Sequence, residues 1–309
     1  MTLLLTTQSR PDRRKLGPLT GTASGLTRIG TLIAVVLPFL GLLAAIVSLW
    51  GWAVSWRELS LFLGMYVATV LGVTIGYHLL FTHRSFETGG TIQFFLGVLG
   101  SMAMQGSLFQ WVAYHRRHHQ HSDGQEDPHS PHHHGPGLQG MLHGLWYAHL
   151  GWFFKPCFPG LSLYIPDLRK SALLRLISAL FPVWIMAGLL VPAVAGWLLI
   201  GGWIGVLIGF LWGGLVRIFF VHHVTWSINS VCHLWGRQPF PGRDQSRNNL
   251  ILGVLAFGEG WHNNHHAFPT SARHGFHWWQ FDMSYWLIRA MASCGLAWNV
   301  KMPTAEVLA

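Results

Sequence analysis

The amino-acid sequence predicts an all-α integral membrane protein, with four transmembrane helices and a cytosolic helical cap that carries a histidine-rich site for two metal ions. Three observations support this prediction. Hydrophobic residues make up 51% of the 309 positions, and charged residues only 10%. Three long stretches contain no charged residue, and the histidines gather in short clusters. Soluble domains rarely contain such stretches, so we expect the chain to cross a membrane.

The uncharged stretches are long enough for four crossings. They are residues 29–56, 59–77 and 176–216, which contain 28, 19 and 41 residues. One crossing needs about 20 apolar residues, so we expect the longest stretch to cross twice. The two glycines at 201–202 allow a tight turn between its halves. The predicted spans are residues 30–52, 58–78, 176–199 and 202–222.

The distribution of basic residues predicts the orientation. Of the 20 Lys and Arg residues, only Arg57 falls in a loop on the far side of the spans. By the positive-inside rule, both termini and both long loops face the cytoplasm. Residues 1–28 are then a cytosolic tail, and residues 29–309 form a single domain whose cap comprises residues 79–175 and 223–309. The basic residues are scattered and no nucleic-acid motif accompanies them, so no nucleic-acid partner is expected.

Residues 88–114 form a further uncharged segment that could pass for a fifth span. They contain three Gln and several Gly residues, which favour a helix that lies at the membrane interface or is half inserted. A complete crossing would place the histidines before and after this segment on opposite faces of the membrane.

Three histidine clusters have the spacing of metal ligands. Two of them follow the i, i+3, i+4 pattern that puts side chains on one helix face: His115, His118 and His119, and His262, His265 and His266. A third pair, His78 and His83, stands five residues apart at the inner end of the second span. Neutral imidazole is the commonest metal-ligating side chain, and eight are too many for one ion. The pattern therefore predicts two metals in a nitrogen-rich site.

Each cluster alone has a simpler interpretation. A pair such as His78 and His83 can be incidental, and a single HxxHH sequence can be a solvated basic helix face. The three clusters together, on one side of one membrane, favour a metal site. A metal transporter is the alternative from another class, but it needs polar residues within the spans, and these contain almost none.

Other polar residues receive smaller roles. The segment DPHSPHHHGPG, residues 127–137, is interpreted as a surface loop because Pro and Gly flank its histidines at positions 129 and 132–134, with adventitious metal binding as the alternative. The two histidines at 222–223 are interpreted as interfacial. Metal-bound imidazoles usually donate their second N–H to a carboxylate, so at least one of Asp127, Glu259 and Asp282 is expected to accept such a bond. No catalytic side chain is expected beyond the metal site.

The histidine boxes HLLFTH, HRRHH and HNNHH, together with AHLGW, TWSINSVCHLWG and GEGWHNNHHAFP, resemble the integral-membrane fatty acyl desaturases. The similarity covers about residues 60–300 and is strongest to the Δ9, stearoyl-CoA desaturase-like branch, in its bacterial form. The resemblance implies a ninth ligand, His233, and a residue that reaches one metal through water, Asn229. It also implies two iron ions, which zinc can replace in purified preparations, and a bacterial inner membrane as the location.

The resemblance further implies the reaction. An O₂-dependent enzyme would introduce a cis double bond into a saturated long-chain acyl group, with electrons from a separate protein of ferredoxin, rubredoxin or cytochrome b5 type and its reductase. A membrane hydroxylase or alkane monooxygenase is the closest alternative, because these enzymes use similar histidine boxes. The positions that would bend the acyl chain in its tunnel are Gln105, Trp111, Thr225 and Trp226, for which interfacial packing is the simpler interpretation.

The acyl group of the substrate is expected to be attached either to CoA or to a membrane lipid. Where the acyl-CoA enzymes have an Arg-Asp pair before the second box, this sequence has Ala113 and Tyr114, which makes an acyl-lipid substrate a serious contender. The closed end of the tunnel is predicted from the rise of an α-helix along the second span. At 1.5 Å per residue, Tyr66 lies about 18 Å from the level of His78, and Phe62 lies about 24 Å from it. Tyr66 is therefore the predicted floor, with a packing or lipid-facing aromatic as the alternative.

Overall fold

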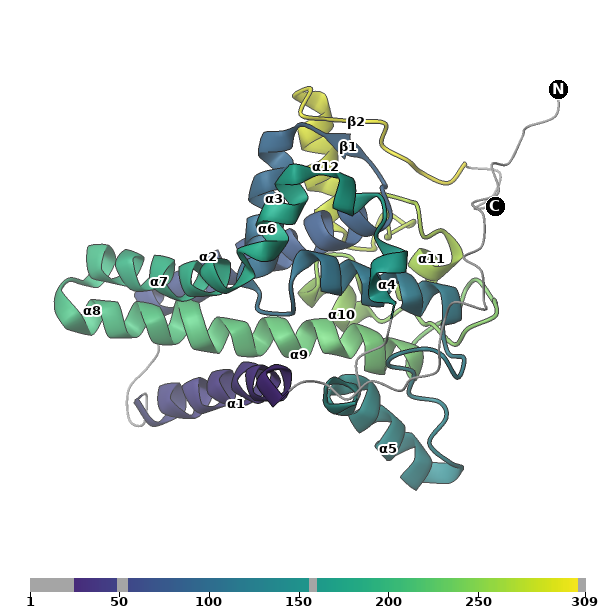
Figure 1. The fold of residues 1–309 in the computed structure, drawn as a ribbon, viewed down its shortest axis with the longest axis horizontal. Coiled ribbons are helices and arrows are strands. Elements are labelled where there is room, and N and C mark those ends of the chain that lie inside the picture. The colour runs from purple at the N-terminus through teal and green to yellow at the C-terminus, as the bar shows by residue number, and fades with distance from the viewer. Residues whose placement is uncertain (1–24, 49–54, 156–159, 305–309) are drawn as a thin grey trace.

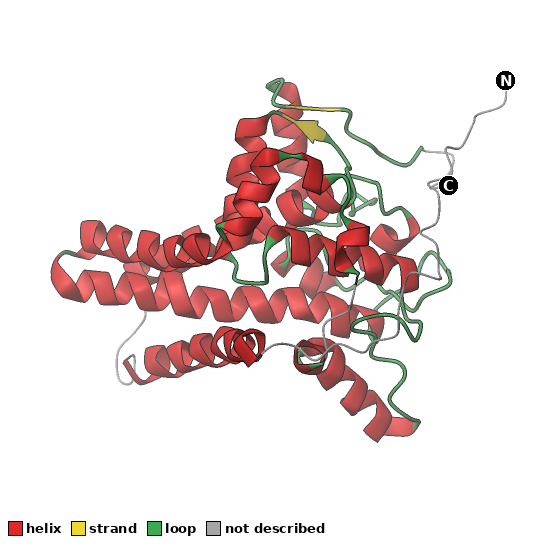
Figure 2. Ribbon diagram, viewed as in Figure 1, coloured by secondary structure: helices red, strands yellow, loops and turns green. Residues whose placement is uncertain are grey.

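A computed structural model describes residues 25–48, 55–155 and 160–304 of the chain. Within these ranges nearly every regular element is a helix, and the only strands are the antiparallel pair β1 (Glu87–Thr88) and β2 (Ala297–Trp298). Figure 1 shows long helices lying side by side in one half of the molecule and shorter helices gathered in the other half, and Figure 2 shows how little of the chain is strand. The predicted all-α fold is therefore confirmed.

Four helical segments are long and apolar enough to cross a membrane: Arg28–Ser48, Trp56–Thr82, Phe181–Ile200 and Gly202–His233. The first belongs to α1 (Gly25–Ser48) and the third is α7 (Phe181–Ile200). The second joins α2 (Trp56–Leu71) to a π-helix, η2 (Gly72–Thr82). The fourth joins α8 (Gly202–Gly209), the π-helix η6 (Phe210–Val216), α9 (Arg217–Ser230) and η7 (Val231–His233).

The limits of these spans differ from the predicted ones by more than two residues at three of the described ends. The second and fourth spans continue to Thr82 and His233, beyond the predicted ends at 78 and 222. The third begins at Phe181 rather than at residue 176, because α6 (Ala172–Ala179) is a separate helix. Pro182 stands in the first turn of α7, where its missing N–H is tolerated, and it could not continue α6. Residues 49–52 of the first predicted span lie outside the described ranges.

The turn between α7 and α8 is formed by Gly201 and Gly202, whose φ angles of 91° and 58° favour glycine. The two helices approach closely: a Cβ atom at Gly196 would lie 2.1 Å from the carbonyl oxygen of Gly205. Small residues allow such contact between membrane helices.

Residues 88–114 do not form one continuous span. They comprise α3 (Gly90–Met102), a turn, and the start of α4 (Leu108–His121). At 1.5 Å per residue, the 13 residues of α3 measure about 20 Å, which is less than the hydrocarbon thickness of a bilayer. The other helices of the cap are α5 (Gly137–His149), α10 (Leu250–Leu255), α11 (His262–Ala267) and α12 (Met283–Ser293), with 3₁₀ turns η3 (Gly151–Phe154), η4 (Leu161–Tyr164) and η5 (Leu168–Lys170).

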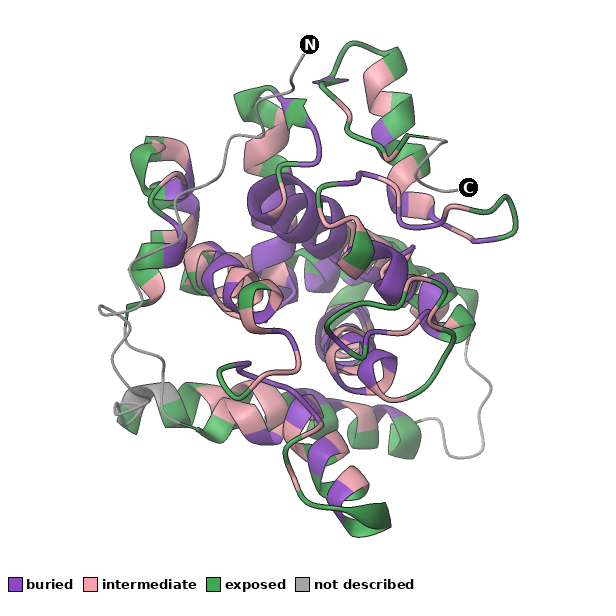
Figure 3. Ribbon diagram, turned by 90° about the vertical axis from the view of Figure 1, so that its right-hand side faces the viewer, coloured by how far each residue is buried: buried purple, intermediate pink, exposed green. Residues whose placement is uncertain are grey.

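Burial is concentrated where the spans meet the cap. Every residue of η2 is buried, and Figure 3 shows buried ribbon at the centre and exposed ribbon at the periphery. The long apolar helices are exposed instead: Val47 of α1 is 72% exposed and Trp203 of α8 is 82% exposed. Large apolar side chains exposed along helices of this length are typical of surfaces that face lipid.

Candidate metal centre

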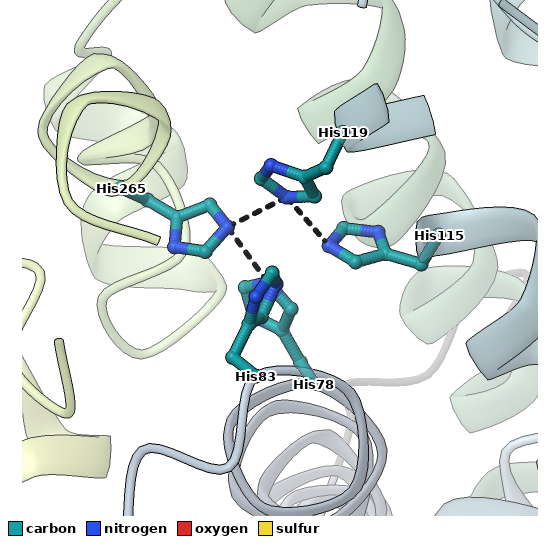
Figure 4. Close-up of side chains that lie close together, drawn as sticks. All are labelled: His78, His83, His115, His119 and His265. Atoms are coloured by element: carbon teal, nitrogen blue, oxygen red, sulfur yellow. Dashed lines mark hydrogen bonds between the residues drawn. The ribbon is translucent and has the colours of Figure 1, made fainter. Parts of the chain in front are cut away.

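Nine histidines from four segments converge between the spans and the cap. They form two groups in which all ligating atoms lie within 4.8 Å of one another: His78, His83, His115, His119 and His265, and His118, His233, His262 and His266. Figure 4 shows the rings of the first group pointing toward a common centre from η2, α4 and α11. Two groups of four or five imidazoles can hold two metal ions.

The five-residue spacing of His78 and His83 is explained by the π-helix. In an α-helix, residues five apart point about 140° away from each other. In η2 the backbone N–H of His83 instead donates to the carbonyl of His78 at 3.1 Å, and the two ring centroids lie 4.7 Å apart. A π-helical segment at a functional site is a recurrent feature of long helices.

Arg116 fixes α4 against the end of η2. Its guanidinium donates to the carbonyl oxygens of Phe81 (2.8 Å) and Thr82 (3.2 Å) and to both oxygens of Asp167 (2.7 and 3.0 Å). Burial would raise the pKa of Asp167, but the hydrogen bonds and charges of Arg116 and Arg84 lower it to about 2. The contacts with Phe81 and Thr82 set the three histidines of α4 relative to those of η2, and the bidentate contact with Asp167 holds the guanidinium in this position.

Asparagine side chains inside and outside the third box hold α11 in place. The side-chain oxygen of Asn248 accepts from the backbone N–H groups of Asn263 (2.9 Å) and Asn264 (3.2 Å). The amide of Asn264 donates to the carbonyl of His274 at 2.7 Å. A helix of six residues gains little from its own hydrogen bonds, so these side chains supply its orientation.

Four carboxylates accept hydrogen bonds from Nδ1 atoms of the clustered histidines. Glu259 contacts His78 at 2.7 Å and Asp127 contacts His118 at 3.0 Å, and both acids belong to the predicted set. Two further pairs were not predicted: Asp123 with His233 at 2.9 Å and Asp244 with His266 at 3.0 Å. Their sequence signal is only that both lie between the second and the third histidine box.

Asp282 has a different role from the predicted one. Its carboxylate accepts from the backbone N–H groups of His274 (2.7 Å), Gly275 (2.9 Å) and Tyr285 (3.0 Å). None of these contacts is to a ring of the two histidine groups, so Asp282 shapes the loop after α11 and caps α12.

Burial keeps most of these imidazoles neutral. It lowers the pKa of His83, His115, His119, His265 and His266 well below the usual value, and the charges of neighbouring histidines lower it further. His118 is the exception. Burial opposes its protonation too, but the charge and hydrogen bond of Asp127 raise its pKa above the usual value. A neutral imidazole has a lone pair available for a metal.

The hydrogen-bond pattern around the rings fits metal ions. Because Glu259 fixes the proton of His78 on Nδ1, the Nε2 atom of His78 presents a lone pair, and it lies 3.0 Å from Nε2 of His265. Nε2 of His265 also lies 2.9 Å from Nε2 of His119, and one proton cannot serve both contacts. The Nε2 atoms of His118 and His266 are buried without a hydrogen-bond partner. Converging buried lone pairs of this kind are satisfied by a cation.

The loop at residues 129–134 is only partly the predicted surface loop. His133 is exposed, but His129 is only 3% exposed, and its ring centroid lies 4.4 Å from that of His118. The expectation is therefore wrong for His129. The cause is Asp127, which accepts from the backbone N–H of His129 at 3.1 Å and so draws the loop toward the histidines. His118, Asp127 and His129 form a third close group.

A cavity of about 350 Å³ extends from the histidine centre into the spans. Its lining includes His115, Glu259 and Asn229 at the centre, and all four predicted bend residues: Gln105, Trp111, Thr225 and Trp226. Further into the stem it is lined by Thr74, Val73, Val70 and Ala256. Its volume is in the range of small-molecule binding sites.

Three of the four predicted bend residues are joined by hydrogen bonds. The amide nitrogen of Gln105 donates to the hydroxyl of Thr225 at 2.9 Å, and its oxygen accepts from the indole N–H of Trp111 at 3.3 Å. Tyr66 does not line the cavity but lies one helical turn beyond Val70, where its hydroxyl donates to the carbonyl of Leu255 at 2.8 Å. Tyr66 is buried, so it does not face lipid.

Four spanning helices, a buried polyhistidine centre and an apolar cavity that leads from it define a membrane protein built to act on a long apolar molecule. A family model described as "Fatty acid desaturase" matches residues 50–299. The chain belongs to this family and is a fatty acyl desaturase. The histidine groups are consistent with the metal dependence of the family.

Individual relatives differ in the acyl carrier that their names give. The chain is 44% identical over 275 residues to a hex-5-enoyl-[acyl-carrier protein] acetylenase of Moorena producens (strain JHB), covering 88% of this chain and 86% of the relative. It is 36% identical over 286 residues to an sn-1 stearoyl-lipid 9-desaturase of Anabaena variabilis, covering 92% and 97%. It is 38% identical over 277 residues to an icosanoyl-CoA 5-desaturase of Limnanthes douglasii, covering 88% and 72%.

The two histidine groups should each account for one bound metal ion. We expect His265→Ala and His262→Ala each to lower the metal content from about two ions per chain to about one and to abolish desaturation, because each removes one imidazole from a different group. Metal would be measured by inductively coupled plasma mass spectrometry on the purified protein. His277→Ala is the control, since His277 is exposed and outside both groups. Full metal content in both group variants would contradict the assignment.

The carboxylate behind His118 should matter for metal binding. We expect Asp127→Asn to weaken metal affinity or activity about 10- to 100-fold, because the neutral amide no longer fixes the proton of His118 on Nδ1. The measurement is metal retention against a competing chelator. Glu126→Gln is the matched control, because the side chain of Glu126 is 57% exposed. Equal retention in both variants would show that Asp127 acts only on the loop.

Proposed function

We propose that the protein is an O₂-dependent, two-iron desaturase that places a cis double bond at the ninth carbon of a saturated long-chain acyl group. The observation that carries this proposal is the position of the cavity, which begins at the histidine centre and continues into the membrane stem. The proposed ligands are the nine clustered histidines, with Asn229 reaching one metal through water. Asn229 lies near the end of α9 and lines the cavity, and His233 follows four residues later in the 3₁₀ turn η7.

Different residues of the chain have different roles in this reaction. Two bound irons supply, from O₂ and two electrons, the oxidising power that removal of hydrogen from an unactivated methylene requires. The protein holds the imidazoles in place through carboxylates such as Glu259 and Asp127. The contact between Gln105 and Thr225 shapes the bend that presents the reacting carbons. No acidic or basic side chain is needed to attack the substrate.

The depth at which the cavity lining ends supports reaction at the ninth carbon of a C18 chain. Val70 stands eight residues before His78, which is at most about 12 Å at the α-helical rise and less where η2 is a π-helix, and the nine carbons beyond carbon 9 of a C18 chain span about 11 Å. Val70 lines the cavity and Tyr66 does not. The ring of Tyr66 packs against Phe62 (5.7 Å between centroids) and Phe257 (6.0 Å), which gives it a fixed place for a floor.

The outer end of the cavity supports a membrane lipid as the acyl carrier. Its lining includes Thr31 of the first span and Phe153 and Lys155 next to α5. On one face of α5, at four-residue spacing, Leu138, Leu142 and Trp146 are 68%, 52% and 54% exposed. Such a stripe is typical of a helix that lies in the membrane interface. A mouth between a span and an interfacial helix admits an acyl chain sideways from the leaflet.

The charge at this mouth also favours a lipid. Lys155 is the only Lys or Arg among the described residues that line the cavity, and its ammonium group lies 5.3 Å from the centroid of the Tyr147 ring. One cation suits the single phosphate of a glycerolipid, whereas CoA carries several phosphates. The positions 113 and 114, which are Ala and Tyr, add no further charge.

The proposal also includes the membrane topology of the chain and its electron donor. The excess of Lys and Arg in the cap supports a bacterial inner membrane protein with both termini and the histidine centre on the cytoplasmic side. We place residues 29–309 in one desaturase domain after a tail at 1–28. Electrons would reach the centre from a separate ferredoxin-, rubredoxin- or cytochrome b5-type protein with its reductase.

Product analysis tests the reaction. In a bacterial host without acyl desaturases, we expect expression to give membrane lipids with a cis double bond at carbon 9, located by mass spectrometry of derivatised chains. Hydroxylated chains would identify a hydroxylase instead. In vesicles, with iron and an electron donor, we expect faster turnover of stearoyl-phospholipid than of stearoyl-CoA or stearoyl-acyl-carrier protein. Preference for either soluble carrier would contradict the lipid assignment while leaving the desaturase assignment intact.

Tyr66 should limit the chain length. We expect Tyr66→Ala to shift products from a mixture of saturated chains toward longer ones, because it opens space beyond Val70. Tyr66→Phe is the matched control: it loses the hydrogen bond to Leu255 but keeps the ring, and so should keep the wild-type profile. An unchanged profile for Tyr66→Ala would remove Tyr66 from the mechanism.

A further inference from the structure

Arg217 is a fully buried guanidinium inside the fourth span. Its three nitrogens donate to three carbonyl oxygens from three helices: Gly213 of η6 (3.0 Å), Gly188 of α7 (2.7 Å) and Met102 at the end of α3 (2.7 Å). No ion pair of the described residues includes it. A charged residue within a membrane span is costly and usually has a specific function.

The surroundings of Arg217 are shaped for it. A Cβ atom at Gly188 would lie 3.3 Å from the guanidinium and 3.0 Å from the carbonyl of Met102, so glycine leaves room for both. The planar fork of arginine can reach three carbonyls in different directions, which lysine cannot do with the same geometry. This arrangement ties the C-terminal end of α3 to the start of α9.

His222 continues the same contact along α9. Its Nε2 donates to the carbonyl oxygens of Ala103 (2.9 Å) and Met104 (3.1 Å), and its side chain is buried. Arg217 and His222 therefore satisfy three successive carbonyls, those of residues 102–104. These groups end α3 and would otherwise have no partner within the helix.

The turn that follows α3 depends on these hydrogen bonds from Arg217 and His222. Met104 has a φ angle of 60° and Gly106 one of 105°, so the turn leaves α3 through a conformation that is unfavourable for a residue with a side chain. Between them stands Gln105, whose amide reaches Thr225 on α9 and lines the cavity. One wall of the bend thus comes from this turn and the opposite wall from α9.

We propose that Arg217 and His222 are positioning residues that hold the turn at residues 103–106 against α9 and thereby determine which pair of acyl carbons lies at the histidine centre. This inference rests on the proposed desaturase function. Moving the turn along α9 moves Gln105 relative to the histidines, and a displacement of about 1 Å, close to one carbon of an extended chain, is enough to misplace the reacting bond.

The test compares double-bond positions. Wild type, His222→Phe and Arg217→Lys would be purified, loaded with iron and given one saturated acyl substrate. His222→Phe fills the same space without a donor, and Arg217→Lys keeps the charge but not the fork. We expect the wild type to give a single positional isomer. From each variant, we expect at least about a tenth of the product to have its double bond one carbon away from the wild-type position, and we expect kcat/KM of the variant to be about tenfold lower or more.

Two further measurements separate positioning from general stability. Iron content should be unchanged in both variants, because neither residue belongs to the histidine groups. Ser227→Ala is the control on the same helix, since the hydroxyl of Ser227 donates to the carbonyl of His223 within α9 and has no hydrogen bond to the turn at residues 103–106. A single wild-type isomer from both iron-loaded variants would overturn the inference. Absence of any double bond in the wild-type product would overturn the proposed function instead.

Discussion

The structure depends on the burial of nine imidazoles whose lone pairs converge. Burial removes their solvation and lowers the pKa of most of them, which keeps those rings neutral. Nε2 of His265 then faces Nε2 of both His119 and His78 at hydrogen-bond distance, and one proton cannot serve both contacts. Such an arrangement is stable only with cations at the centre and acceptors behind the rings. The four carboxylates supply the acceptors, and each comes from a loop that is held in place by this contact.

The second and fourth spans both contain π-helical turns, which direct polar side chains into the interior. In η2 the wider turn brings His78 and His83 onto one face at the end of the second span. In the fourth span η6 directly precedes Arg217, whose Nε contacts a carbonyl of that π-helix at 3.0 Å. Wider turns rotate the side chains that follow them, so each span directs a different polar residue into the interior. The distortion of the backbone lies where the function requires it.

The sequence was sufficient for the spans and for the histidine boxes, because both are local patterns of hydrophobicity and spacing. It also contained the hint of the π-helix, since a five-residue spacing does not suit an α-helix. It did not reveal contacts between distant residues. Asp123 lies 110 positions from His233, and the link from Arg116 to Asp167 spans 51 positions. His129 was misplaced because the Pro and Gly residues around it indicate a loop, and only the three-dimensional contact with Asp127 draws that loop inward.

One helix connects the parts of the site that determine the product. Along the fourth span, Thr225 and Asn229 stand four residues apart in α9 and both line the cavity, and His233 follows in the 3₁₀ turn η7. The distance from Thr225 to Asn229 is therefore fixed by a rigid helix, at about 6 Å for four residues. The mouth is built differently, from a 3₁₀ turn and an exposed helix. Changes at the mouth can alter the acyl carrier without moving the histidine centre, and the names of similar proteins give three different carriers.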